Sequence, residues 1–395
     1  VLIMLPNALN DKALAGISMK FDLAGMFVGK EFTEVTANLP CKTWSSTSIG
    51  ETESTFADVE KDTTAAIFFT GGTTGAPKGA VHSHGSIMRG SFNGVFGPGS
   101  ILHKRYIAML PLSHIFGAIM GYMAKLYTGS LTYTCTDMRA GIGDIPVVRP
   151  TTLVLVPGLV EIILNIAKLK GRAFLGDLEL IMCGAAPVPP RQMEECRELG
   201  ITLCAGYGLT ECANLTSGNC DTDKKPESMG HIYPEQQVKV VDGELWIKGD
   251  NVMKEYYKDP EHTAEVLEDG WFKTGDLVEF DDNDWIYITG RIKNLIILPN
   301  GENVSPEEIE ELFYKQPLVK DCLVQENGNT VIGVEIIPYM PELDGASEEE
   351  IQNRLQETVN EVNKELPSFK RVLKMKVRTE DFKRSGAMKI LRNQV

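Results

Sequence analysis

Residues 68–79 read Phe68-Phe69-Thr70-Gly71-Gly72-Thr73-Thr74-Gly75-Ala76-Pro77-Lys78-Gly79, a composition suited to holding a polyphosphate. Four glycines remove Cβ atoms where a backbone must approach an anion closely, three threonines supply hydroxyl donors, and Lys78 adds a mobile positive charge. The run before it, residues 65–70, is apolar and aromatic and predicts a buried strand. The loop therefore leaves the carboxyl end of a strand, where open α/β sheets bind ligands.

The spacing of this loop excludes the commoner phosphate loop, in which Ser or Thr directly follows a Gly-Lys pair. Here Pro77 precedes Lys78 and Gly79 follows it, so no hydroxyl stands at the position of that loop's magnesium ligand. The alternative is an ordinary surface turn, because turns rich in Gly and Thr are common. The predicted strand before the loop favours the nucleotide-binding interpretation.

Length and charge narrow the classes of function. The 395 residues exceed what one hydrophobic core usually holds, which predicts two or more domains. The net charge of -15 disfavours nucleic acid or an anionic membrane as the main partner. No apolar run approaches the length of a membrane span, so we expect no integral membrane segment. An anionic ligand must then be held by a local cluster of donors.

Eight cysteines are scattered along the chain without a CxxC pair. That pattern favours free thiols in a reducing cytoplasm over a disulfide scaffold or a zinc site. The chain begins at Val1 rather than Met, which leaves a fragment or a processed form open.

Apolar runs alternate with helix-like segments between residues 65 and about 210. The predicted strands lie at residues 106–110, 152–156, 178–183 and 202–205, and the predicted helices at residues 159–169 and 190–199. Alternation of this kind predicts an α/β fold with a mainly parallel sheet and helices on its faces.

The pattern changes to β-hairpins after residue 210. Asp242-Gly243 lies between the strand-like runs 238–241 and 244–248 and supplies the positive φ that a tight turn needs. A second hairpin is predicted to pair residues 277–280 with residues 285–289. We therefore expect a β-rich subdomain within the first domain.

A small α+β unit is predicted at the C-terminus. Ser305-Pro306-Glu307-Glu308 opens a helix with an N-cap, proline at the first helical position and an acidic first turn. A hairpin turning at residues 327–329 and a helix at residues 347–365 follow. We place the boundary near residues 290–294, which predicts a large N-terminal domain, residues 1–290, and a small C-terminal domain, residues 291–395.

Small and polar residues recur where the predicted strands end. Leu110-Pro111-Leu112-Ser113-His114 places His114 at the carboxyl edge of the sheet, although a lone histidine is more often a surface or core residue. Cys183-Gly184-Ala185-Ala186-Pro187 is small enough for a flat ring to lie against its backbone, although by itself it is equally a tight turn.

Gly206-Tyr207-Gly208-Leu209-Thr210-Glu211 is more specific. Tyr207 offers an aromatic face to a base, and Glu211 is an oxygen ligand suited to Mg²⁺ on phosphates. The alternative is a threonine that caps a helix with glutamate in the first turn. Further on, Gly275-Asp276 places a carboxylate after a glycine turn, where it can accept ribose hydroxyls.

Basic residues lie at the predicted domain junction and near the C-terminus. Arg291 and Lys293 stand in Thr289-Gly290-Arg291-Ile292-Lys293-Asn294, and Gly301 begins the stretch before Ser305. The tail Arg384-Ser385-Gly386-Ala387-Met388-Lys389-Ile390-Leu391-Arg392 is basic and small, which alone would predict only a solvated end.

Together these ordered motifs, spread over residues 64–392, resemble those of the acyl-adenylating superfamily, which includes acyl-CoA synthetases, nonribosomal peptide adenylation domains and beetle luciferases. The resemblance implies an AMP-binding adenylation domain at residues 1–290 and a C-terminal lid domain at residues 291–395. It implies an enzyme that uses ATP and Mg²⁺ to convert a carboxylic acid into an acyl-AMP, and that then passes the acyl group to CoA or to a carrier protein.

The resemblance also implies roles for single residues. The phosphates would be held by the loop residues Thr70, Gly71, Gly72, Thr73, Thr74, Gly75 and Lys78, and the metal by Glu211, with Thr210 beside the α-phosphate. Adenosine would contact Gly184, Ala185, Ala186, Tyr207, Gly208, Asp276 and Arg291. Lys389 would bridge the carboxylate and the α-phosphate, Lys293 would be the hinge of the lid, Gly301 would line the thiol channel, and His114 would separate the acyl pocket from that channel.

The chain departs from the superfamily's pattern at three places. Gly71 stands where many relatives carry Ser, and Met388 where Gly is frequent. About seventy residues precede the loop, whereas the superfamily normally carries a longer region there, so we expect a shortened N-terminal part. Sheet edges left uncovered would need another partner, which makes a homodimer possible.

The acid is indicated by the sizes of a few residues and by the short hairpin Val241-Asp242-Gly243-Glu244-Leu245-Trp246, which resembles that of bacterial long-chain fatty-acid–CoA ligases. Small side chains at Gly184, Ala185, Ala205 and Gly206 would leave a long slot for an acyl chain, which favours a fatty acid, with an aryl acid as the alternative. Absence of Asp after Leu110 disfavours an amino acid. A hypothesis from another class is a catalytically silent nucleotide-binding protein.

Overall fold

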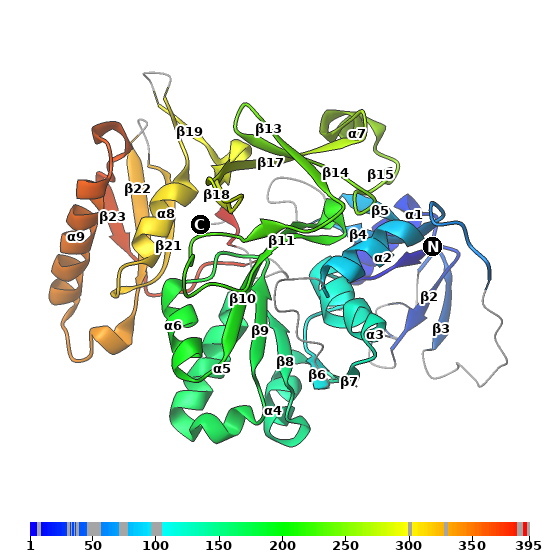
Figure 1. The fold of residues 1–395 in the computed structure, drawn as a ribbon, viewed down its shortest axis with the longest axis horizontal. Coiled ribbons are helices and arrows are strands. Elements are labelled where there is room, and N and C mark those ends of the chain that lie inside the picture. The colour runs from blue at the N-terminus through cyan, green and yellow to red at the C-terminus, as the bar shows by residue number, and fades with distance from the viewer. Residues whose placement is uncertain are drawn as a thin grey trace.

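The structure is a computed structural model (Figure 1). It describes residues 1–5, 9–29, 32, 34, 36, 39–45, 57–70, 78–95, 105–298, 302–327, 331–384 and 390–392. Sheets of seven, four and five strands build a large unit, and a three-stranded sheet with two long helices builds a smaller unit at the C-terminus. The expected α/β fold with a large and a small part is confirmed.

The seven-stranded sheet is mainly parallel, as the alternation of strands and helices predicts. Its strands, in spatial order, are β12 (His231–Ile232), β11 (Asn214–Asn219), β10 (Thr202–Leu209), β9 (Leu180–Gly184), β8 (Thr152–Leu155), β6 (Arg105–Ala108) and β7 (Leu131–Thr134). The strands from β10 to β7 run parallel, and β11 and β12 are antiparallel additions. The carboxyl ends of β9 and β10 therefore lie side by side.

Helices and buried strands form the main core around this sheet. The helices after its strands are α4 (Met138–Val148), α5 (Pro157–Lys170) and α6 (Pro190–Glu198). A π-helix, η3 (Phe116–Met123), continues into α3 (Ala124–Tyr127), and α2 (His84–Asn93) packs beside them. Because β8 is buried on both faces, its sequence is continuously apolar after Thr152.

The four-stranded sheet carries the ends of the predicted phosphate loop. Its order is β1 (Leu2–Ile3), β4 (Thr64–Phe69), β5 (Gly79–Ser83) and β15 (Glu255–Tyr256). The strand before the loop is confirmed, but β4 and β5 pair antiparallel. The loop therefore joins the two strands of a hairpin, and does not lead from a parallel strand into a helix.

The five-stranded sheet confirms both predicted hairpins. Its strands are β13 (Gln237–Val241), β14 (Glu244–Lys248), β17 (Trp271–Phe280), β16 (Leu267–Glu268) and β18 (Ile286–Arg291), with α7 (Pro260–Val266) beside β16. In the turn between β13 and β14, Asp242 and Gly243 both have positive φ, 51° and 82°. This is the backbone conformation for which an Asp-Gly turn is favoured.

The C-terminal unit has its own hydrophobic core (Figure 1). Its elements are β19 (Ile296–Ile297), β20 (Asn303–Val304), α8 (Pro306–Tyr314), β21 (Val319–Glu326), β22 (Ile332–Pro338), α9 (Glu348–Glu365) and β23 (Lys374–Val377). Ser347 caps α9 in a capping box with Glu350. The first residue of this core is Ile296, while the boundary at residues 290 and 291 stays a prediction.

Short 3-10 turns complete the element list: η4 (Arg172–Leu175), η5 (Thr210–Cys212), η6 (Ile292–Asn294), η7 (Met340–Glu342) and η8 (Ser368–Lys370). Two of them, η5 and η6, follow β10 and β18 directly. They place Thr210, Glu211 and Lys293 immediately beyond strand ends.

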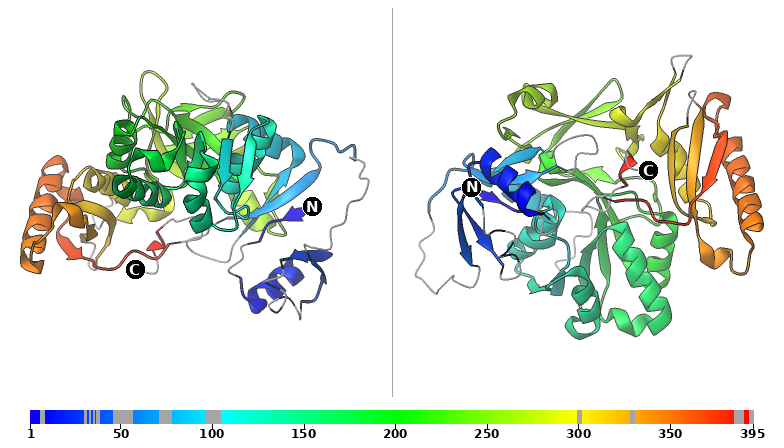
Figure 2. Two further views of the ribbon diagram at one scale, coloured as in Figure 1. Left: turned by 90° about the horizontal axis from the view of Figure 1, so that it is seen from below. Right: turned by 180° about the vertical axis from the view of Figure 1, so that it is seen from behind.

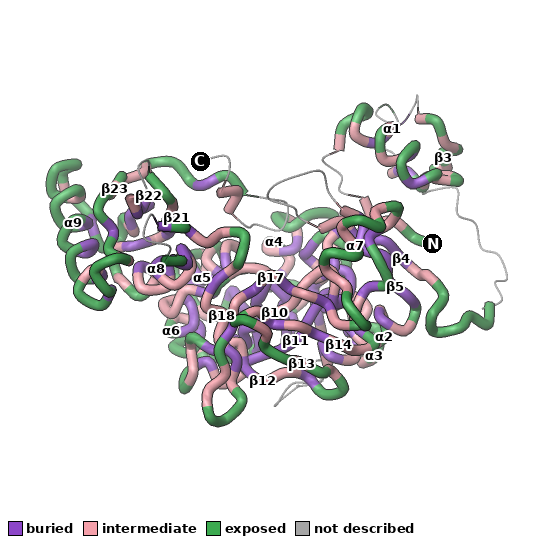
Figure 3. Tube along the Cα trace, turned by 90° about the horizontal axis from the view of Figure 1, so that it is seen from above, coloured by how far each residue is buried: buried purple, intermediate pink, exposed green. Residues whose placement is uncertain are grey.

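The elements between β1 and β4 stand apart from the large unit. They are α1 (Asp11–Lys20), β2 (Gly25–Val28) and β3 (Lys42–Ser45), seen at the blue end of the chain in Figure 2 and as a mainly exposed segment in Figure 3. Phe21 links them to the large unit, because its ring stacks on Tyr257 at a centroid distance of 4.9 Å and packs with Ile67 and Val81. An ion pair between Asp22 and Lys258 adds a second link.

Among the described residues, apolar side chains are exposed at one edge of the seven-stranded sheet. On the edge strand β7, Leu131 is 69% and Tyr133 is 42% exposed. Leu126 and Tyr127 of the neighbouring α3 are also exposed. In the described part of the chain, no helix combines the length and the apolar character that crossing a bilayer requires.

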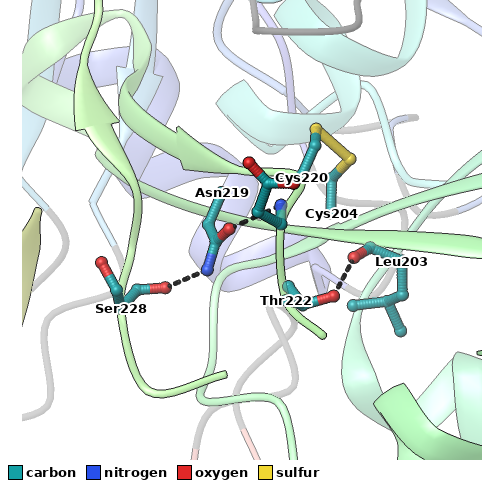
Figure 4. Close-up of a disulfide and its surroundings, with 7 residues drawn as sticks. Leu203, Cys204, Asn219, Cys220, Thr222 and Ser228 are labelled. Atoms are coloured by element: carbon teal, nitrogen blue, oxygen red, sulfur yellow. Dashed lines mark hydrogen bonds between the residues drawn. A yellow bond between two sulfur atoms is a disulfide. The ribbon is translucent and has the colours of Figure 1, made fainter. Parts of the chain in front are cut away.

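A disulfide joins Cys204 of β10 to Cys220 just beyond β11 (Figure 4). The expectation of free thiols is therefore wrong for this pair, and the other six cysteines are free. Ala205 pairs with Asn219 across the two antiparallel strands, so residues 204 and 220 come to face one another. Because the register of two strands brings these cysteines together, no local motif in the sequence marks them as a pair. By chain-entropy arguments, cross-linking a loop of this length contributes about 3 kcal/mol.

Candidate functional site

Three residues expected to contact adenosine meet between two sheets. Tyr207 of β10 donates its hydroxyl hydrogen to Asp276 Oδ2 over 2.7 Å. Arg291, at the end of β18, approaches Asp276 Oδ1 with its Nε at 3.2 Å, because Asp276 and Arg291 are register partners in β17 and β18. The antiparallel hairpin thus brings a carboxylate and a guanidinium to the end of β10.

The Asp276 carboxylate is 6% exposed and is held from the backbone side as well. Its N–H donates to Thr274 Oγ1 over 3.0 Å, and that hydroxyl donates to the carbonyl of Leu245 over 2.7 Å. Burial, and then the charge of Asp276, raises the pKa of Tyr207 well above its usual value. The phenol therefore stays protonated and serves as a donor that fixes the carboxylate.

Thr210 and Glu211 lie in η5, directly after β10. The hydroxyl of Tyr256 donates to Glu211 Oε1 over 2.7 Å, and the N–H of Met253 donates to the Glu211 carbonyl over 2.7 Å. Both ends of Glu211 are thus fixed from the segment that contains β15. A carboxylate oriented in this way can provide one oxygen to a Mg²⁺ whose other ligands are phosphates and water.

Buried His82 of β5 holds the Thr210 backbone. Its Nε2 is 2.8 Å from the Thr210 carbonyl and its Nδ1 is 3.1 Å from the Ser86 hydroxyl. Burial lowers the pKa of His82 to about 4, against a weaker opposing effect of the bond to Thr210. The imidazole is therefore neutral at pH 7, and Nε2 carries the hydrogen because a carbonyl only accepts.

The two described ends of the phosphate loop lie against this network. The N–H of Thr70 donates to the carbonyl of Lys78 over 2.9 Å, which closes the base of the loop. The Lys78 ammonium lies 5.0 Å from the centroid of the Tyr256 ring. Gly71, Gly72, Thr73, Thr74 and Gly75 lie outside the described residues, so their expected contacts stay predictions.

The small residues expected to border adenine form a closely packed strand pair. Gly184 of β9 faces Gly206 of β10, and a Cβ on Gly184 would lie 3.1 Å from the Gly206 carbonyl and 3.3 Å from the Phe116 ring. A Cβ on Gly206 would lie 2.8 Å from Leu215, and one on Gly208 only 1.8 Å from the Asn214 carbonyl. At Gly184, Gly206 and Gly208 the missing side chains thus make room for neighbouring protein atoms. Two of these residues, Gly184 and Gly206, were expected to leave an open slot.

Ala185 and Ala186 follow β9 and are partly exposed. Ala185 has a φ of +69°, a strained conformation for a residue with a side chain. Backbone strain of this kind occurs often at ligand sites. It supports, without testing, the expectation that this turn borders a ligand.

Helix α2 approaches η5 closely. A Cβ on Gly90 would lie 2.0 Å from the carbonyl oxygen of Ala213, the residue directly after η5. Ala213 has a φ of +49°, so the chain reverses sharply after Glu211. Only glycine at position 90 leaves room for this turn.

His114 and Lys293 stand at the expected strand ends. His114 is half-buried between β6 and η3, and its N–H donates to the Pro111 carbonyl over 3.1 Å. Lys293 is exposed within η6, two residues after Arg291. Their roles in gating and hinging stay predictions.

Lys389 and Gly301 lie outside the described residues. The segment with Lys389 is flanked by Arg384 and Ile390, which form an antiparallel bridge. Arg384 pairs with Asp321, and Arg392 pairs with Glu310 Oε2 over 2.6 Å. Ion pairs with other residues of the C-terminal unit therefore fix both flanks of the segment that contains Lys389.

Tyr256 and His82 are the site residues that sequence reasoning missed. Tyr256 is separated from Glu211 by 45 positions and has no motif of its own. His82 follows the phosphate loop on β5, and its place on a buried strand beside a Ser-rich turn was a signal that could have indicated an inward-facing histidine. Among the described residues no group of three His, Cys, Asp or Glu side chains could hold a metal ion.

Two family models match this chain. The sequence model of the AMP-binding enzyme family matches residues 24–257, and that of the AMP-binding enzyme C-terminal domain matches residues 293–395.

Two relatives illustrate the extent of the similarity. Peroxisomal OPC-8:0-CoA ligase 1 of Arabidopsis thaliana is 28% identical over 352 residues, which are 80% of this chain and 61% of that protein. Indoleacetate–CoA ligase of Aromatoleum aromaticum is 30% identical over 299 residues, 71% of this chain and 58% of that protein. The chain thus spans about three fifths of the length of these curated relatives.

Solved structures share the fold. O-succinylbenzoate coenzyme A synthetase of Bacillus subtilis, in complex with AMP, superposes with a TM-score of 0.81 at 23% identity, over 100% of this chain and 82% of that one. ATP-bound MatB of Rhodopseudomonas palustris has a TM-score of 0.84 at 23% identity, with coverage of 100% and 82%.

Proposed function

Because the chain belongs to the AMP-binding enzyme family, we propose that it is an AMP-forming acid–thiol ligase. In the first step a carboxylate oxygen attacks the α-phosphorus of ATP, and pyrophosphate leaves with its electron pair. In the second step the sulfur of CoA attacks the acyl carbon, AMP leaves, and the thiol proton passes to solvent. The names of relatives that ligate acids to CoA support this reaction.

One observation carries the proposal: a single short segment, residues 207–211, touches both expected halves of a nucleotide site. At its start Tyr207 contacts Asp276, and at its end Glu211 contacts Tyr256, beside Lys78. A nucleotide lying along this segment would meet a carboxylate for its ribose at one end and a metal ligand and an ammonium for its phosphates at the other.

The residues of this chain would then act mainly by positioning and by neutralising charge. Asp276 and Arg291 would bind the ribose hydroxyls, and Tyr207 would stack on the base. Thr210 would lie beside the α-phosphate and Lys78 beside the outer phosphates. Magnesium held at Glu211 supplies positive charge that offsets the charge developing on the phosphates.

The C-terminal unit would act as a lid. In this proposal residues 291–395 turn about Lys293, which brings Lys389 to the carboxylate and the α-phosphate for the first step. Rotation in the other direction would bring the strand near Gly301 to the thiol channel, with His114 at the boundary of the acyl pocket. The bridge between Arg384 and Ile390 supports this role by holding the two flanks of the lysine together.

The acid can be a fatty acid, as the sequence suggests, or an aryl acid. The close packing at Gly184 and Gly206 removes part of the argument for a long slot. Several relatives are named for acids with an aromatic ring, among them indoleacetate–CoA ligase and feruloyl-CoA synthase. We therefore give the aryl acid equal standing with the fatty acid.

Compartment and assembly are part of the proposal. A cytoplasmic location fits the six free cysteines. The Cys204–Cys220 disulfide would need an oxidant or a protected position there. One relative is named as peroxisomal. The exposed edge at β7 supports a homodimer. A carrier protein remains an alternative to CoA as the acceptor.

The test is exchange of labelled pyrophosphate into ATP in the presence of single fatty, aryl and amino acids. We expect exchange with a fatty or an aryl acid and thioester formation once CoA is added. Exchange without CoA acylation would favour a carrier protein. ATP binding without exchange for any acid would contradict the ligase and favour a silent nucleotide-binding protein.

Lys389→Ala tests the second half of the proposal. This variant should lose formation of acyl-AMP, because no ammonium bridges the two anions, yet retain thioester formation from supplied acyl-AMP. Lys383→Ala, which changes an exposed lysine near the same segment, is the matched control. Equal loss of both steps in Lys389→Ala would contradict its assignment.

A further inference from the structure

We propose that Tyr256 is a positioning residue that sets the metal-binding carboxylate of Glu211 and the ammonium of Lys78 with the two parts of one side chain. The inference rests on the proposed function of the site, because it assigns Glu211 to magnesium. It goes further because it names a side chain that lies outside the sequence motifs. Through this side chain, the contact of Glu211 with the metal and the contact of Lys78 with the phosphates would depend on each other.

The hydroxyl group acts on Glu211. It donates to Oε1 over 2.7 Å, a short distance typical of a hydrogen bond to a charged acceptor. With Oε1 engaged in this bond, Oε2 would be the oxygen left to hold Mg²⁺. The backbone of the three-residue η5 is fixed separately, by the bond from the N–H of Met253 to the Glu211 carbonyl.

The ring acts on Lys78. The ammonium lies 5.0 Å from the ring centroid, within the range in which an aromatic face attracts a cation. A lysine at the end of a glycine-rich loop has four rotatable bonds, and the ring restricts where its charge can lie. Because Tyr256 is 5% exposed, water competes little with this attraction.

Backbone bonds make Tyr256 a rigid reference point. Tyr256 pairs with Ala80 of β5, the N–H of Tyr257 donates to the Gly79 carbonyl over 2.8 Å, and the N–H of Tyr256 donates to Thr263 Oγ1 over 2.9 Å. The strand that leaves the phosphate loop and the strand that carries Tyr256 are therefore one hydrogen-bonded unit.

The direction of this hydrogen bond follows from the chemistry of the two groups. A phenol hydroxyl donates and a carboxylate oxygen accepts, so Tyr256 is the donor and Glu211 the acceptor.

The test compares Tyr256→Phe with Tyr257→Phe. Both variants remove one hydroxyl from adjacent residues, but the Tyr257 hydroxyl contacts the Phe21 carbonyl at 3.4 Å, away from Glu211. The dissociation constant of ATP is measured calorimetrically with excess EDTA and over a series of Mg²⁺ concentrations, together with the melting temperature of each variant.

ATP binding should tighten as the Mg²⁺ concentration rises. We expect Tyr256→Phe to raise the Mg²⁺ concentration at which half of this effect is reached by about tenfold or more, because the variant loses one hydrogen bond to a charged group. Affinity for ATP in EDTA should stay within about twofold of the wild type, because the ring still faces Lys78. Tyr256→Leu should weaken ATP binding in EDTA as well. Tyr257→Phe should leave both quantities unchanged.

Two results would overturn the inference. One is a Tyr256→Phe variant with the Mg²⁺ dependence of Tyr257→Phe, and the other is a wild type whose ATP affinity does not respond to Mg²⁺. A wild type that binds ATP with magnesium but exchanges no pyrophosphate would contradict only the proposed reaction. A uniform loss of affinity with and without Mg²⁺, accompanied by a lower melting temperature, would reduce Tyr256 to a structural role.

Discussion

The residues of the proposed nucleotide site in the large unit and the C-terminal unit are stabilised by different chemistry. In the large unit the site residues are positioned by protonated phenols and a neutral imidazole, at Tyr207, Tyr256 and His82. In the C-terminal unit the flanks of the Lys389 segment are held by buried ion pairs, Arg392 with Glu310 and Arg384 with Asp321. The two units should therefore respond in opposite directions to a change of pH.

The sign follows from two shifted pKa values. Burial lowers the pKa of His82 to about 4, so its contribution is complete above about pH 6.5, the unfolded value, and is lost as the pH falls toward 4. Burial raises the pKa of Glu310 to about 7, against the opposing charge of Arg392. Its contribution is complete below about pH 4.5 and is lost as the pH rises toward 7. Between these limits one unit gains stability with pH while the other loses it.

Arg392→Ala should have the largest effect on stability. Removal of one partner from a buried ion pair costs about 3–5 kcal/mol, and without Arg392 the buried Glu310 carboxyl loses the positive charge that offsets its burial. Helix content followed by circular dichroism should show early unfolding of the C-terminal unit. All four tryptophans, Trp44, Trp246, Trp271 and Trp285, precede residue 291, so tryptophan fluorescence should report an unchanged large unit.

Arg371→Ala, at an exposed position of the same unit, is the control. Two results would remove the contrast between the units. One is equal destabilisation by Arg392→Ala and Arg371→Ala, and the other is a fluorescence transition of the large unit that shifts together with the circular dichroism transition.

Glu310→Gln sharpens the comparison through pH. In the wild type the free energy of unfolding of the C-terminal unit should fall by on the order of 3 kcal/mol from pH 4.5 to 7, and in the variant this slope should disappear. Denaturant titrations at half-unit intervals, read by circular dichroism and by fluorescence, separate the two units. A wild-type C-terminal unit that becomes more stable with rising pH would contradict the assignment.

Asp276→Ala should act on binding, with a smaller effect on stability. The carboxylate accepts from Tyr207 and faces Arg291, so its loss removes the expected ribose ligand and leaves two donors without it. We expect ATP affinity to fall by about 100-fold, measured by calorimetry. Asp282→Ala, in the exposed turn after β17, should bind ATP normally. Unchanged affinity in Asp276→Ala would exclude the proposed adenosine site.

Lys315→Ala should have the smallest effect. Lys315 joins the end of α8 to Glu227 of the large unit at 2.7 Å, but the two side chains are 37% and 45% exposed. A pair of this kind contributes less than about 1 kcal/mol. The free energies of unfolding of the two units, read by circular dichroism and by tryptophan fluorescence, should change by less than about 1 kcal/mol at low and at high salt. A larger shift would mean that the units are coupled and cannot be compared as independent parts.

Local patterns predicted the elements well where their cause is local. The Asp242-Gly243 turn, the α9 cap at Ser347 and the strand before the phosphate loop follow from residues next to one another. The order of motifs likewise indicated Asp276, Arg291, Thr210 and Glu211, which the fold gathers into two clusters.

Features set by pairing between distant strands could not be predicted. The antiparallel return of β5, the disulfide from Cys204 to Cys220 and the place of Tyr256 all depend on register across sheets. The expectation of an open slot was wrong at Gly184 and Gly206 for a related reason. A glycine in the sequence indicates only that another group approaches its backbone closely. Tertiary packing decides whether that group is a ligand or a protein side chain, such as Leu215 beside Gly206.

Gly90 has a consequence for the engineering and the evolution of this site. It contacts no expected ligand, yet any side chain there would press on the Ala213 carbonyl and displace the turn that carries Glu211. Substitutions at this helix position would therefore disturb the backbone around Glu211 without changing any residue of the proposed site. A library that varies the proposed site residues should keep Gly90 fixed.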